Sequence, residues 1–122
     1  MKTYRDLIVW QKAITLVTEV YSATSTFPKE ELFAITSQIK RSGISIPSNI
    51  SEGYGRQHRL EYIRFLQIAR GSLYELQTQL EISGNLNFLN QTTLKSLLEK
   101  CNKIERMLNK LIGILKQNTK NT

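Results

Sequence analysis

The chain has 122 residues, of which 40% are hydrophobic and 22% are charged, and its formal net charge is +7. This length favours one domain over residues 1–122, and this composition argues against a disordered chain. No apolar run reaches the roughly 18 residues of a membrane span, and the N-terminal residues lack the pattern of a secretory signal. We therefore expect a cytoplasmic protein, and the single cysteine, which allows no intrachain disulfide, agrees with this expectation.

A first helix is predicted over about residues 6–24. Apolar residues recur along it at spacings of three and four, as in one helical stripe: Leu7, Trp10, Ile14, Val17 and Tyr21. Further apolar residues widen this surface: Ile8, Val9, Ala13, Leu16 and Val20. A four-helix monomer does not easily cover so wide an apolar surface, so we expect a partner chain to cover part of it. The alternative is that partly exposed positions absorb the excess.

A second helix is predicted over about residues 28–53. Pro28 suits its first turn, where the missing N–H is not needed. Pro47 lies inside the helix, where its ring clashes with the carbonyl of Gly43, so we expect a kink near Pro47. Gly53 and Gly55 then allow the backbone to turn.

The third and fourth helices are predicted over about residues 58–83 and 90–116. Gly84 is expected to end the third helix. Gly71 costs about 1 kcal/mol relative to alanine inside a helix, so we expect a close helix crossing there. The connections between the helices are short, so neighbouring helices must run antiparallel. The sequence therefore predicts an all-α, up-down-up-down four-helix bundle.

The positive charge is concentrated in two blocks. Residues 38–70 carry a net charge of +4, and residues 95–122 carry +5. Such blocks attract a polyanion, and nucleic acid is the commonest one in the cytoplasm. The alternative interpretation is a solvated helix surface that keeps the protein soluble.

A nucleic-acid-binding site is expected where basic and aromatic residues surround one end of the bundle: Tyr54, Arg56, His58, Arg59 and Arg64. Lys40 and Arg41, on the preceding helix, are expected to add to it. Arginine binds phosphate through two parallel hydrogen bonds, and an exposed tyrosine can stack on an unpaired base. This mixture favours RNA. Internal ion pairs are the alternative, and for Arg70 we expect such a pair, with Glu52 or Glu75.

Residues suited to catalysis are scarce. The chain has one histidine, His58, and one aspartate, so a di-metal site with two histidines is excluded. Cys101 falls on the apolar face of the fourth helix, where a small buried side chain is expected. The segment 53–55 lacks the lysine and hydroxyl of a phosphate-binding loop. We therefore expect no enzyme, no metal and no cofactor.

Six segments carry a resemblance to a known family: Asp6–Leu7, Trp10–Ala13, Phe27–Glu31, Ile39–Ser42, Ser45–Gly53 and Phe65–Leu76. They closely resemble the small four-helix-bundle proteins encoded in bacterial 23S ribosomal RNA intervening sequences. That family is similar to the accessory protein of diversity-generating retroelements, which binds nucleic acid beside a reverse transcriptase. Members of both groups form barrel-shaped homopentamers, so the resemblance implies a homopentamer here. Where other members often have alanine, this chain has Ser51.

From these observations we expect a non-enzymatic, homo-oligomeric helical bundle that binds RNA, with ribosomal RNA as one candidate. The alternative is an assembly module that recruits a protein partner and whose basic residues serve solubility.

Overall fold

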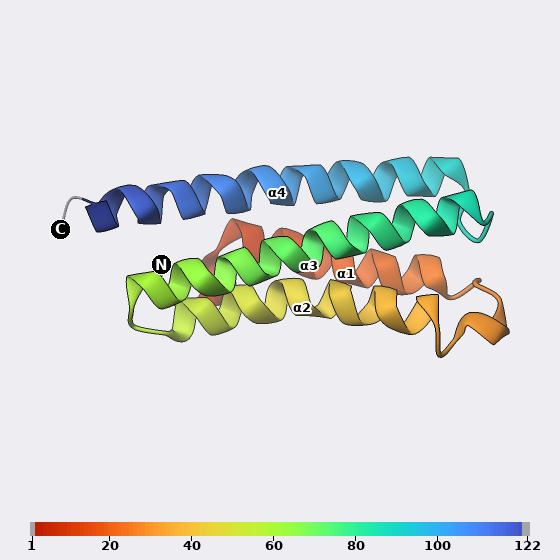
Figure 1. The fold of residues 1–122 in the computed structure, drawn as a ribbon, viewed down its shortest axis with the longest axis horizontal. Helices are drawn as coiled ribbons and strands as arrows, with labels where there is room; N and C mark the ends of the chain where they lie inside the picture. Colours follow the sequence, from red (N-terminus) through yellow and green to blue (C-terminus); the bar gives the residue numbers. More distant parts are fainter. Residues whose placement is uncertain (1, 121–122) are drawn as a thin grey trace.

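The computed structural model describes residues 2–120, with side chains described through Asn118. Within this part all regular structure is helical, with two short 3-10 helices (η) and four α-helices: η1 (Tyr4–Asp6), α1 (Ile8–Thr24), η2 (Lys29–Glu31), α2 (Ile35–Gly55), α3 (Arg59–Asn85) and α4 (Gln91–Lys120). The α-helices alternate in direction, and α4 extends past the α2–α3 connection (Figure 1). The predicted antiparallel four-helix bundle is confirmed.

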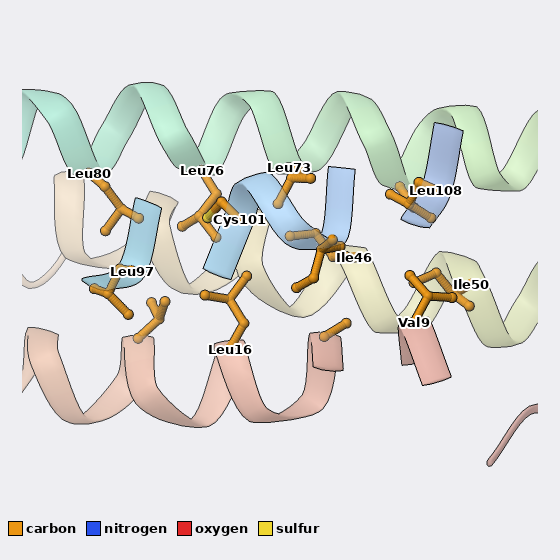
Figure 2. Packing of buried hydrophobic residues seen from close by; sticks show 14 of the residues in the cluster. Val9, Leu16, Ile46, Ile50, Leu73, Leu76, Leu80, Leu97, Cys101 and Leu108 are labelled. Atoms are coloured by element: carbon orange, nitrogen blue, oxygen red, sulfur yellow. The ribbon is translucent and has the colours of Figure 1, made fainter. Parts of the chain in front are cut away.

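The core forms where the apolar faces of all four helices meet (Figure 2). Its fully buried side chains come from every helix, among them Leu16, Ile46, Ile50, Leu73, Leu76, Leu80, Cys101 and Leu108. Each large apolar side chain buried in this way contributes about 1.5–3 kcal/mol. On α1 the core face is Val9, Ala13, Leu16 and Val20. Most of the stripe predicted from the sequence is not part of this buried face. Ile14 and Tyr21, for example, remain 40% and 39% exposed.

The second helix begins later and ends later than predicted. Residues 28–31 form η2 with its preceding proline, and the backbone of Ala34, at φ −119° and ψ −114°, separates this turn from α2. From Ile35 the helix continues through Pro47 to Gly55. The kink near Pro47 stays a prediction, whereas the expected turn at Gly53 was wrong.

Two glycines allow close packing of neighbouring helices. A Cβ at Gly53 would lie 2.6 Å from the Cβ of Phe65, and a Cβ at Gly84 would lie 2.6 Å from Leu94 Cδ2. Gly84 is therefore a packing position inside α3, and the expectation that it ends the helix was wrong. The left-handed residue after α3 is Asn87, with φ 62°. At Gly71 a Cβ would meet no atom within 4 Å, so close packing does not explain this glycine, whereas the adjacent Ser72 lies close to α2, with its hydroxyl 2.8 Å from that of Ser45.

Polar side chains link α2 to α3 along a contact that we call the α2–α3 seam. The buried hydroxyl of Ser42 donates to Gln79 Oε1 at 2.8 Å, and the hydroxyls of Ser45 and Ser72 lie 2.8 Å apart. Asn49 Nδ2 donates to the Ser45 carbonyl at 2.7 Å. The Asn49 bond lies within α2 and holds the Ser45 position, whereas the other two bonds each join one position on α2 to one on α3 and so fix the register of the two helices.

The α3–α4 contact carries a second row of hydrogen bonds between side chains. Arg70 Nη1 donates to Asn109 Oδ1 at 2.8 Å, and the Tyr74 hydroxyl donates to Glu105 Oε2 at 3.0 Å. The pairing of Arg70 with Glu52 or Glu75 was therefore wrong. The fourth helix begins where predicted, because Asn90 Oδ1 accepts the N–H of Thr93 at 2.8 Å, but it continues to residue 120.

Candidate nucleic-acid interface

Five of the predicted site residues gather around the connection between α2 and α3. Because α2 ends at Gly55 and α3 starts at Arg59, residues 54–59 lie at one tip of the bundle. His58 is the residue before α3, and its side chain makes no capping hydrogen bond. Arg64 follows one and a half turns into α3. All but Tyr54 are exposed: Arg56, His58, Arg59 and Arg64.

Arg56 is occupied by partners within the chain. Its Nη2 lies 3.0 Å from Glu52 Oε1, and its Nε lies 3.9 Å from Glu61 Oε2. The guanidinium also lies 5.1 Å from the ring centroid of Phe65. An exposed pair of this kind contributes only about 0.2–1 kcal/mol, so Arg56 can still exchange these partners for a phosphate.

Tyr54 takes part in helix packing. It is half-buried, and its ring contacts that of Tyr62 edge to face, with the centroids 6.0 Å apart. Burial, together with the neighbouring Tyr54, raises the pKa of Tyr62 to about 12. The ring of Tyr54 is therefore not the freely exposed stacking surface that the sequence suggested.

Lys40 and Arg41 lie far from this tip. Arg41 precedes Arg56 by 15 residues, which is roughly 22 Å along a helix. The Lys40 ammonium lies 4.8 Å from the ring centroid of Tyr21 on α1. The predicted set of residues is thus divided between two parts of the molecule.

The end of α4 brings a further cation toward the α2–α3 tip. Arg70 is bonded to Asn109, and extending this antiparallel register by seven residues places Lys116 opposite Ile63. Figure 1 shows the end of α4 reaching beyond the start of α3. We call the group His58, Arg59, Arg64 and Lys116 the basic tip. The two positively charged blocks of the sequence approach each other there.

A second basic site lies between α1 and α4, and the sequence did not indicate it. A cavity of about 160 Å³ is lined by three lysines, one hydroxyl residue and one apolar residue: Lys12, Thr15, Lys100, Lys103 and Ile104. We call it the lysine pocket. Lys100 pairs with Glu19 at its edge. The spacing of Lys100 and Lys103 was visible in the sequence, but placing Lys12 beside them requires the register of α1 against α4.

The groove between α1 and α2 is mainly apolar. Its volume is about 280 Å³, and it is lined by Tyr4, Trp10, Ile14, Val17, Ile44, Pro47, Ser48 and Ser51. Ile14 is 40% exposed and Ile44 is 45% exposed. The surplus apolar surface expected on the first helix therefore lies in this groove, which we call the α1–α2 groove.

Residues of possible chemical use include the metal-binding side-chain types and the single cysteine. Among residues 2–120 no three of the His, Cys, Asp and Glu side chains lie close enough to hold a metal ion. Burial, and the nearby Glu105 carboxylate, raise the pKa of the Cys101 thiol to about 12, which keeps it protonated at neutral pH.

Within residues 2–120, no helix combines the length and apolar character needed to cross a membrane.

The fold is shared with a solved structure. It is similar to the crystal structure of a protein of unknown function from the S23 ribosomal protein family of Bacteroides thetaiotaomicron VPI-5482, with a TM-score of 0.78 and 25% sequence identity. The similarity covers 86% of this chain and 98% of that one. No protein with a curated description matches the sequence.

A family model described as "23S rRNA-intervening sequence protein" matches residues 5–110, which include all of α1, α2 and α3 and most of α4. The resemblance carried by the six segments is thereby confirmed, and the chain belongs to the family of 23S rRNA-intervening sequence proteins.

Proposed function

We propose that this protein is a non-enzymatic, homo-oligomeric RNA-binding protein of the cytoplasm. The observation that carries the proposal is that most of the lysine and arginine side chains face the solvent. The chain has 17 lysines and arginines, and among the described side chains only Arg56 and Lys100 form ion pairs with carboxylates. Of the remaining described cations, Arg70 is hydrogen-bonded to Asn109 and Lys40 lies against the Tyr21 ring, and the exposed ones are available to phosphates. The family name refers to 23S ribosomal RNA, which makes ribosomal RNA a candidate ligand.

The basic tip is the first proposed contact with RNA. Arg59 and Arg64 are exposed and form no ion pair within the described residues. Each guanidinium can donate two parallel hydrogen bonds to a phosphate. Lys116, on the neighbouring helix, adds a point charge.

Binding to a single-stranded RNA 20-mer at 50 and 200 mM salt tests this function. Displacement of counterions from several phosphates makes the affinity fall steeply as the salt concentration rises. We expect Arg59→Ala/Arg64→Ala to weaken the binding and to leave the far-ultraviolet circular dichroism unchanged. A wild-type protein that binds no RNA, or that binds it equally at both salt concentrations, would contradict the proposal.

Self-association is the second part of the proposal, and a homopentamer is the assembly that the family resemblance implies. The α1–α2 groove is the surface that a second copy of the chain would cover, because exposed apolar side chains gather there. Native mass spectrometry should show an oligomer of the wild type, and Ile14→Lys/Ile44→Lys should shift it to monomer. A monomeric wild type at micromolar concentration would refute this part.

One observation favours an alternative function as a module that recruits a protein partner. Phe33, in the connection between α1 and α2, is 92% exposed, and the adjacent Leu32 is 50% exposed. A pull-down from nuclease-treated lysate with the wild type and with Phe33→Ser distinguishes the two functions. A partner that is retained without RNA and lost in Phe33→Ser favours recruitment.

A further inference from the structure

The lysine pocket lies on the opposite side of the bundle from the α2–α3 seam. Each helix contacts two neighbours, and α1 with α4 and α2 with α3 form opposite sides of the four-helix arrangement. The pocket combines Lys12 and Thr15 from α1 with Lys100, Lys103 and Ile104 from α4. Its volume of about 160 Å³ is too small for a folded segment but admits a phosphate group.

The charge in this pocket is not balanced. Glu19 pairs with Lys100, which is the one ion pair between α1 and α4 among the described residues. Lys12 and Lys103 are exposed and form no ion pair there. Two like charges held beside one pocket repel each other, and an anion bound between them removes that repulsion.

Lysine suits such a contact because its ammonium is a compact point charge on a flexible stem. Lys103 is also followed by Lys110 seven residues later, so the two lie on the same side of α4 about 10 Å apart. A strand that enters the pocket and follows α4 would thus meet a further cation.

We propose that the lysine pocket binds a phosphate of the RNA backbone, as a site separate from the basic tip. The inference rests on the proposed RNA-binding function and adds a second point of contact. Lys12 and Lys103 supply the charge, and Lys100, which Glu19 holds in place, lines the pocket wall. With contacts at the tip and in this pocket, the RNA would extend along α4 over much of its length.

Lysine acetylation of the wild-type protein, with and without an oligouridylate 20-mer, tests the site without any mutation. The reagent is N-hydroxysuccinimidyl acetate, and the modified residues are quantified by mass spectrometry. We expect RNA to slow the modification of Lys12 and Lys103 by about threefold or more, because two-thirds occupancy already has this effect. Lys29, in η2 beyond the C-terminal end of α1, is the internal control and should react equally with and without RNA.

A pair of matched variants provides an independent measurement. Lys12→Gln/Lys103→Gln should weaken RNA binding by about tenfold, as expected for the loss of hydrogen bonds to charged groups. It should also reduce the slope of log affinity against log salt by about 0.7 for each phosphate that the variant no longer neutralises. Lys2→Gln/Lys29→Gln removes the same charge elsewhere and should change the affinity by less than about twofold.

The outcomes separate the two proposals. If the wild type binds RNA but Lys12 and Lys103 are not protected, or if both double variants weaken binding equally, the lysine pocket is not a phosphate site and the proposed function stands. If the wild type binds no RNA, the proposed function fails and this site fails with it. Urea unfolding midpoints confirm that both variants are folded.

Discussion

The α2–α3 seam and the α1–α4 contact are opposite sides of one bundle, yet their polar residues are arranged differently. Along the α2–α3 seam the polar groups are small, buried or half-buried and bonded to one another, as in the pair Ser42 and Gln79. Gly53 lets the helices approach closely there. Between α1 and α4 long charged side chains line the lysine pocket beside Thr15, and Glu19 with Lys100 is the one ion pair that joins these two helices in the described part of the chain.

One small domain thus carries its buried polar bonds and its exposed charge on different sides. Buried hydrogen bonds are costly to lose, because the polar group that remains is buried and cannot form a hydrogen bond with water instead. Exposed lysines contribute little to folding but keep their charge available to a ligand. We therefore expect substitutions in the α2–α3 seam to affect mainly the free energy of unfolding, and substitutions in the α1–α4 contact to affect mainly RNA affinity.

The largest effect on stability is expected for Gly53→Ala. The new Cβ would lie 2.6 Å from the Cβ of Phe65, which cannot rotate away, so the helices must separate. We predict a loss of about 2–3 kcal/mol in the free energy of unfolding, measured by urea denaturation. Gly71→Ala is the control, because its Cβ meets no atom and the helix gains up to about 1 kcal/mol. Equal effects of the two substitutions would contradict the close contact at Gly53.

A smaller loss is expected for Ser42→Ala. The substitution leaves Gln79 Oε1 buried without its hydroxyl donor, which costs about 1–2 kcal/mol. RNA affinity should stay the same, because Ser42 is far from the proposed contacts. The matched control is Ser96→Ala, an exposed position on α4, where alanine should be neutral or slightly stabilising. If the two variants unfolded at the same urea concentration, this buried bond would not stabilise the seam.

Glu19→Gln changes the α1–α4 side instead. It removes the one carboxylate that pairs with Lys100, so the stability should fall by no more than about 1 kcal/mol. The affinity for RNA should rise by up to about fivefold, because the lysine pocket becomes more positive. Fluorescence anisotropy with a labelled RNA measures this change. A weaker affinity than that of the wild type would show that the carboxylate supports binding.

The smallest response is expected from the thiol of Cys101. Burial holds the pKa of this thiol at about 12, so at pH 8 almost none of it is the reactive thiolate. Iodoacetamide should therefore label it at pH 8 only after the protein is unfolded in urea. Rapid labelling of the folded protein would mean that α4 separates from the core.

Much of the fold could be predicted because apolar spacing follows helical geometry. The spacing on the fourth helix agrees with its buried face, which includes Cys101 and Leu108. The buried face of the first helix could not be predicted in this way, because apolar residues occupy more than one side and only packing decides between Ile14 and Leu16. Glycine was ambiguous for a related reason. Both a turn and a close helix contact favour glycine. At Gly53 the position of Phe65 shows that the close contact is the reason.

The candidate site was predicted only where its residues are close in the chain. The connection that carries His58 and Arg59 could be found in this way. The pairing of Arg56 with Glu52 was also accessible, since four residues separate them on one helix. The lysine pocket was not accessible, because it joins Lys12 to Lys103, far away in the sequence. Such a site depends on the register between helices, which local sequence does not determine.

The most direct test of this division is the RNA affinity of Lys12→Gln/Lys103→Gln compared with that of Ser42→Ala, each at a temperature where the protein is fully folded. We predict that the lysine variant binds RNA about tenfold more weakly than the wild type, whereas the serine variant binds it as the wild type does. Unchanged affinity of the lysine variant, or an equal loss in the serine variant, would contradict the assignment of binding to the α1–α4 side.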